Sequence, residues 1–220
     1  RRLRSLINDL RQHSGRVLFQ LNHPRDFDAP DPDLAYFENL LNGDGYNPSQ
    51  VLSAESNRSL IALDPVSGVR DIDFDLLEVA NGNNFQMYEA VRDDWFSLLS
   101  QGERIFGSAN SDSHGSSSLV AMPVNYVAVV DDAITAYRQD EFIEAVTTGN
   151  FFGTTGPMLR LGYLSAEGGL AYPGGELSSA EVTLRLTVTA ASWVPVEQLK
   201  LYINGKLDRS MPITINETVE

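Results

Sequence analysis

An aspartate and a histidine two residues apart, Asp112 and His114, follow a short apolar run in the middle of the chain. The run, at residues 104–107, has the composition of a buried strand, so both side chains can turn toward one point just past its end. Carboxylate oxygen and imidazole nitrogen are ligands that Zn²⁺ and similar divalent ions accept in proteins. The pair therefore indicates a candidate metal site.

A second histidine, His23, follows the apolar run at 17–21, and Glu78 lies near the end of a third apolar run. Because the carboxyl ends of parallel strands meet at one face of an α/β fold, we expect these two side chains to converge with Asp112 and His114. The alternative interpretation is that these residues have only a structural role, in hydrogen-bonded loops with exposed histidines. With His23 included, the two interpretations are about equally good.

Arg25 comes two residues after His23 and could bind an anionic substrate through two parallel hydrogen bonds. A loop cation paired with Asp26 or Asp28 is at least as good an interpretation. Asn81 and Asn110 are expected to shape turns rather than to contact substrate. The remaining candidates are expected to be structural or solvated: His13, Asp93, Asp94, Asp131 and Asp132.

The elements that would position these residues alternate between strand and helix over the first 150 residues. Strands are predicted at 16–22, 74–79, 104–108 and 124–130, and helices at 2–13, 34–41, 87–99 and 141–148. This alternation predicts a parallel α/β layout. The segment at 25–71, which is acidic and proline-containing at 25–33 and weakly patterned at 42–71, is predicted to be a mobile excursion or lid.

The pattern changes after Gly149. Residues 182–189 alternate apolar and polar side chains as a half-buried strand does, and 199–203 repeat the pattern before an Asn204–Gly205 hairpin turn. We therefore predict two domains, an α/β domain at 1–150 and a β-rich, sandwich-like domain at 151–220.

Composition restricts the classes of function. The 220 residues carry a formal net charge of −14 and contain no cysteine. Such a charge opposes binding to nucleic acid, and the lack of cysteine excludes disulfides and thiolate metal ligands. No apolar run approaches the roughly 18 residues of a membrane span, so neither nucleic acid nor a membrane is an expected partner. The compartment, cytoplasmic or extracytoplasmic, is left open.

Several short motifs occur in an order that resembles one family. They are Leu21-Asn22-His23-Pro24-Arg25, Asp75-Leu76-Leu77-Glu78-Val79-Ala80-Asn81-Gly82, Gly107-Ser108-Ala109-Asn110-Ser111-Asp112-Ser113-His114, Asn125-Tyr126-Val127 and Thr155-Gly156-Pro157. This series, spanning about residues 12–205, resembles the PHP superfamily of metallohydrolases, and within it the CehA/McbA type.

The resemblance implies a distorted (β/α)7 barrel, two or three divalent metal ions such as Zn²⁺, Mn²⁺ or Fe²⁺, and hydrolysis of a phosphoester, carbamate or ester in a small-molecule substrate. It implies metal-ligand roles for His23, Asp112 and His114, and a role for Glu78 as catalytic carboxylate, ligand or neighbour. The family's opening His-x-His motif has no counterpart here. We therefore expect the chain to be the later part of such a barrel, with activity that depends on ligands preceding Arg1.

A second interpretation is a non-catalytic binding module, in which acidic loops hold Ca²⁺ and the β-rich domain binds a ligand such as carbohydrate. Asp26, Asp28, Asp31 and Asp33 supply oxygens, but prolines stand where calcium loops have a glycine. Trp193 and Tyr202 could line a sugar surface. A third possibility is a barrel fragment that has lost catalysis. Metal content separates the first two, because Zn, Mn or Fe favours the hydrolase and Ca alone favours the module.

Overall fold

The computed structural model describes residues 3–14, 17–26, 35–40, 43 and 45–213. The chain divides into two compact units, residues 1–108 and 109–220, and each is described by itself. The division falls within a strand, whereas the boundary predicted at 150/151 lies inside the second unit. The division into folding domains at 1–150 and 151–220 therefore stays a prediction.

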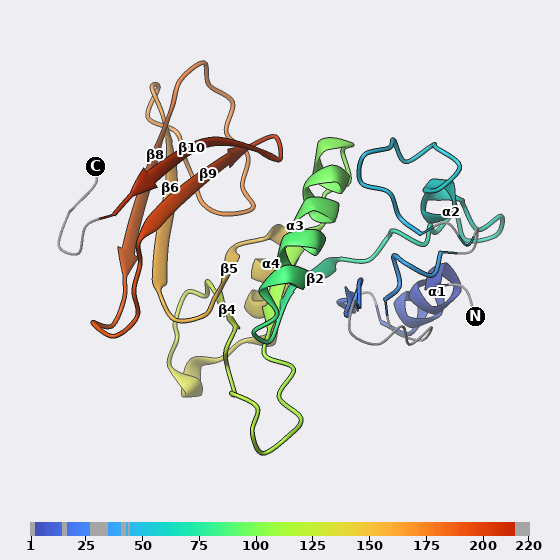
Figure 1. Cartoon of the computed structure of the whole chain (residues 1–220), viewed down its shortest axis with the longest axis horizontal. Helices are drawn as coiled ribbons and strands as arrows, with labels where there is room; N and C mark the ends of the chain where they lie inside the picture. The colour runs from blue at the N-terminus through green and yellow to red at the C-terminus, as the bar shows by residue number, and fades with distance from the viewer. Residues whose placement is uncertain (1–2, 15–16, 27–34, 41–42, 44, 214–220) are drawn as a thin grey trace. The chain divides into compact units, whose positions relative to one another are not determined.

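The described residues of the first unit include a sheet of three strands in the order β1 (Gln20–Leu21), β2 (Leu76–Asn81) and β3 (Phe106–Asn110). Figure 1 labels the central strand, β2. β1 and β2 are parallel. The Phe106 N–H donates to Asp75 O at 3.3 Å and the Ser108 hydroxyl to Leu77 O at 3.3 Å. Because both strands advance in the same direction between these contacts, β3 also runs parallel to β2. The three predicted strands are confirmed, although β1 is shorter than expected.

The helices in the described part of this unit are α1 (Leu3–His13), α2 (Arg58–Ile61) and α3 (Phe85–Ser100). The predicted helices at 2–13 and 87–99 are confirmed. The helix predicted at 34–41 is wrong in the described part, where residues 36–38 form a turn instead. α3 begins after Asn84, whose side chain accepts the Met87 N–H at 3.0 Å and thereby satisfies an otherwise unpaired donor of the first turn.

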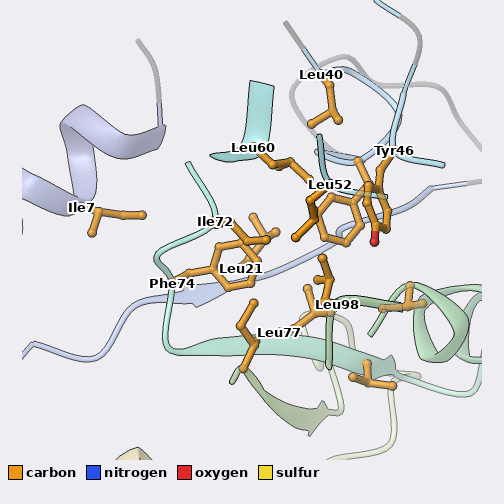
Figure 2. Close-up of a cluster of buried hydrophobic side chains, with 14 of the residues drawn as sticks. Ile7, Leu21, Leu40, Tyr46, Leu52, Leu60, Ile72, Phe74, Leu77 and Leu98 are labelled. Carbon is orange, nitrogen blue, oxygen red and sulfur yellow. The ribbon is translucent and has the colours of Figure 1, made fainter. Parts of the chain in front are cut away.

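The core of the first unit draws on the segment that was expected to be a lid. Its described parts contribute Phe37, Leu40, Tyr46, Leu52 and Leu60, each at most 7% exposed, to a cluster that also contains side chains of β2 and α3. Figure 2 shows several of them gathered with Leu21, Ile72, Leu77 and Leu98. The apolar residues of this segment follow no helical or strand periodicity, yet their side chains are buried in the core. The expectation of a mobile lid is therefore corrected for the described residues.

Charged residues anchor the first helix. Arg4 and Asp71 are each 2% exposed, and the Arg4 N–H and guanidinium donate to the two Asp71 oxygens at 2.7 and 2.6 Å. The guanidinium also donates to the Ala62 carbonyl. α1 therefore buries Ile7 and Arg4, while Leu6 and Leu10 stay 38% exposed.

The second unit contains β4 (Val124–Val127), η1 (Ile134–Ala136), α4 (Gln139–Thr148), β5 (Phe151–Thr154), β6 (Met158–Ser165), β7 (Leu170–Ala171), β8 (Val182–Thr189), β9 (Gln198–Ile203) and β10 (Lys206–Pro212). β4 and β5 form an antiparallel pair, which corrects the expectation of parallel pairing up to residue 150.

The remaining described elements of the second unit are β-strands, as predicted. The remaining sheets are β7-β6-β8 and the β9–β10 pair, both antiparallel (Figure 1). β8 coincides with the predicted strand at 182–189. Asn204 and Gly205 form the β9–β10 turn with φ of 51° and 73°, values that the preferred two-residue hairpin turn requires. Stacking of these sheets into a sandwich stays a prediction.

The fold is a mixed α/β structure of several small sheets, and the described residues do not form a closed barrel. Within the same described ranges, no helix combines the length and apolar character that crossing a bilayer requires.

Candidate functional site

His23 and Glu78, two residues singled out in the sequence, are in direct contact in the first unit. The backbone N–H of His23 donates to Oε2 of Glu78 at 2.8 Å. Glu78 lies on β2 and is only 3% exposed. The parallel register pairs Leu21 with Leu77, so the segment after β1 passes beside the next residue of β2. The buried carboxylate thus fixes the backbone that carries the imidazole.

His23 and Asp112 share an unusual backbone conformation, with φ of 46° and 47°. Among the described residues, five non-glycine positions have positive φ. This left-handed region is uncommon for residues with a Cβ, and such strain is found preferentially at functional sites. Two candidate ligands that follow two different strands therefore leave those strands through the same conformation.

Asp112 and His114 are in contact in the second unit. Nδ1 of His114 lies 2.6 Å from the Asp112 carbonyl oxygen and 3.6 Å from Asp112 Oδ1. A carbonyl oxygen can only accept a hydrogen bond, so Nδ1 of His114 carries the hydrogen. Nε2 then has a free lone pair and is the ring atom able to bind a metal. The His114 side chain is 81% exposed and that of Asp112 is 37% exposed. A backbone carbonyl that sets the tautomer is a recurrent feature of metal-binding histidines.

Serine side chains organise the loop that carries this pair. The Ser113 hydroxyl contacts the Leu119 carbonyl at 2.7 Å and the Ser111 hydroxyl at 2.9 Å. The first contact closes a short loop around His114. These serines were not among the residues predicted to form the site, although a Ser-x-Ser pattern around Asp112 is a signal for local side-chain hydrogen bonding.

Arg25 lies in a buried ion pair. Its Nε and Nη2 donate to Oδ2 and Oδ1 of Asp94 at 2.6 and 2.8 Å, and Nη2 also donates to the Tyr46 carbonyl at 2.9 Å. The Arg25 and Asp94 side chains are 15% and 1% exposed. The expectation that Asp94 is a solvated element end is wrong, because α3 turns it inward. Of the two aspartates proposed to pair with Arg25, Asp28 lies outside the described residues.

Burial and pairing shift the ionisation of this group of residues. Burial lowers the pKa of Arg25, but hydrogen bonding and attraction to Asp94 outweigh it and raise the pKa above its ordinary value. Burial raises the pKa of the Asp94 carboxyl, and Arg25 opposes that rise. Burial also raises the pKa of Tyr46 to about 12, against the opposing effect of its hydrogen bond with Ser97. These contacts describe a structural ion pair, and they leave Arg25 little capacity for an anionic substrate.

The first unit also contains an open cavity of about 260 Å³. Its lining is mostly polar and includes Arg70, which binds Asp73 and Glu103. None of the predicted site residues lines this cavity. The cations around it are already engaged with carboxylates or, for Arg104, lie over the Phe106 ring.

The contacting pairs His23–Glu78 and Asp112–His114 have the donor types of a metal site, but neither pair has enough ligands to form one by itself. Imidazole and carboxylate are the donors of hydrolytic Zn or Mn sites. The described part of the chain contains no group of three or more His, Cys, Asp or Glu side chains arranged to hold a metal ion. His23 and Glu78 belong to the first unit and Asp112 and His114 to the second, so their convergence stays a prediction.

The residues named for the binding-module interpretation are only partly described. Asp28, Asp31 and Asp33 of the acidic loop lie outside the described residues. Trp193 is 82% exposed in a turn, and Tyr202 is half-buried on β9. Comparison of the chain with protein-family models, curated proteins and solved structures gives no match.

Proposed function

We propose that this chain is a metal-dependent hydrolase of the PHP type, in which His23, Asp112 and His114 bind divalent metal and Glu78 is a catalytic or ligand-orienting carboxylate. The observation that carries the proposal is the shared left-handed backbone of His23 and Asp112, each located two residues past the end of a strand. These residues were selected by type and spacing, and their strained conformation is independent of that selection.

Strand order supports the proposal. β1, β2 and β3 are neighbours in one sheet. His23 and Asp112 each lie two residues past the carboxyl ends of β1 and β3, and Glu78 lies within β2 between them in sequence. In parallel α/β folds, ligand sites form at that edge. A complete (β/α)7 barrel, with two or three metal ions, is the finer form of this proposal.

The chain's own residues would act through positioning. Glu78 holds the backbone of His23, and the Asp112 carbonyl sets the tautomer of His114. A bound divalent ion would supply a water molecule acidic enough to yield hydroxide near neutral pH. The proposed substrate is a small molecule with a phosphoester, carbamate or ester bond. Arg25 as a substrate-binding residue is the least supported part, because Asp94 and Tyr46 already accept its hydrogen bonds.

The chain offers a matched set of histidine variants for the test. His23→Ala and His114→Ala should each weaken Mn²⁺ or Zn²⁺ binding, measured by calorimetry on the full chain, by at least about tenfold. His13→Ala is the control, because His13 lies at the exposed end of α1 with Nδ1 2.7 Å from Asp9 O. Binding equal in all four proteins, or none in the wild type, would reject the proposal.

Two further measurements complete the test. Any hydrolysis of p-nitrophenyl phosphate or of an aryl carbamate that the wild type shows with added Mn²⁺ should be lost in His114→Ala while unfolding stays cooperative. Elemental analysis of the purified chain should find Zn, Mn or Fe. Calcium alone would reject the hydrolase and favour the binding module.

A further inference from the structure

We propose that Asn125 is the positioning residue that holds the Asp112–His114 loop, so that metal affinity depends on a side chain that binds no metal itself. The inference rests on the proposed function for its link to metal. Its structural half, that Asn125 clamps the base of the loop, stands on hydrogen bonds within the second unit.

The Asn125 side chain makes the hydrogen bonds to the Ala109 backbone that a neighbouring strand would otherwise make. Its Oδ1 accepts the Ala109 N–H at 2.9 Å, and its Nδ2 donates to the Ala109 carbonyl at 2.8 Å. Nδ2 also lies 3.3 Å from Oδ1 of Asn110. One side chain therefore satisfies both backbone groups of one residue, as a neighbouring strand would.

The location of Asn125 makes it a clamp. The loop at 111–123 leaves β3 after Asn110 and returns at Val124, the first residue of β4. Asn125 is the next residue of β4, so its hydrogen bonds join the start of the loop to its end. Inside the loop, the hydrogen bond from the Ser113 hydroxyl to the Leu119 carbonyl closes a smaller loop that contains His114.

The neighbouring strand leaves Ala109 little room to shift. Asn125 pairs with Gly153 of β5. A Cβ on Gly153 would lie 2.5 Å from the Ala109 Cβ, a distance that real side chains do not tolerate. Ala109 is 7% exposed, and β5 passes directly against it. The glycine thus permits the close approach in which the Asn125 amide reaches the Ala109 backbone.

The decisive variants are Asn125→Ala and the milder Asn125→Ser. Hydrogen exchange should accelerate by about tenfold or more at the Ala109 amide and in the loop through His114, because the amide loses its acceptor. In the same variants the Kd for Mn²⁺ should rise by about tenfold, as losses of residues that orient ligands do.

Leu186→Ala is the control for a general loss of stability. Leu186 pairs with Leu161 across β8 and β6, in a different sheet from the β4–β5 pair that carries Asn125. This variant should lower the melting temperature at least as much as Asn125→Ser while leaving exchange at Ala109 and the Kd for Mn²⁺ unchanged. An equal rise of Kd in Leu186→Ala, or unchanged exchange at Ala109 in both Asn125 variants, would overturn the inference.

Failure of the proposed function has a different signature. If the wild type binds neither Mn²⁺ nor Zn²⁺, the hydrolase is rejected and the metal-affinity half of the inference falls with it. Exchange at Ala109 then decides the clamp by itself.

Discussion

Arg25 and Asp94, 69 residues apart in the sequence, bind each other through two parallel hydrogen bonds of 2.6 and 2.8 Å. The contact ties the segment after β1 to the middle of α3. Because Arg25 follows His23 by two residues, the same contact helps to hold the backbone that carries a candidate metal ligand.

The first prediction concerns this ion pair. Arg25→Met leaves the Asp94 carboxylate buried without its cation, so the free energy of unfolding should fall by about 3–5 kcal/mol in urea titrations. The double variant Arg25→Met, Asp94→Leu should recover most of the loss. Arg92→Met, which removes a pair with the exposed Asp93 on the same helix, should cost less than about 1 kcal/mol. A loss below that value for Arg25→Met would show that the pair is not the anchor described.

The second prediction concerns alkaline pH. Tyr46 has a pKa of about 12 in the folded chain, against about 10 when unfolded. Its contribution is fully present below about pH 10 and is lost as the pH rises from 10 through 12, because the unfolded chain ionises first. Between pH 8 and 11.5 the free energy of unfolding should therefore fall more steeply in the wild type than in Tyr46→Phe. Parallel slopes would refute the assignment.

The third prediction concerns Asn57, which is fully buried. Its amide donates to the carbonyls of Asn47, Gln50 and Val51, and its Oδ1 accepts the Asn47 N–H. Asn57→Ala should cost roughly 2–3 kcal/mol, since it strands buried backbone groups. In the wild type, amides hydrogen-bonded within 47–60 should be protected from exchange, in contrast to a mobile lid. Rapid exchange of these amides would restore the lid interpretation.

The fourth prediction concerns the start of α3. Asn84→Ala removes the side chain that accepts the Met87 N–H, and should cost about 0.5–2 kcal/mol in thermal unfolding. Asn84→Asp keeps the acceptor and places a negative charge at the helix N-terminus, so its stability should match or exceed that of the wild type. Equal losses in both variants would argue against a capping role.

Local pattern by itself determined the elements whose stability is encoded in neighbouring residues. The spacing of Met87, Val91 and Leu98 predicts α3, and the alternation over 182–189 predicts β8. The Asn204–Gly205 turn followed from the positive φ that both residues tolerate. His23, Glu78, Asp112 and His114 are recognisable because their residue types and their places in or after predicted strands are visible along the chain.

Tertiary structure alone decided which polar groups are buried and what satisfies them. Arg4 binds Asp71 and Arg25 binds Asp94 across 67 and 69 residues of sequence. The Asn57 side chain supplies the hydrogen bond that the Asn47 carbonyl of the same loop would otherwise receive from a neighbouring strand. A helical or strand period records which face turns inward, but not which distant group lies opposite it. A buried charge is stable only when that group is in place, so its burial becomes predictable only after the chain has brought the partners together.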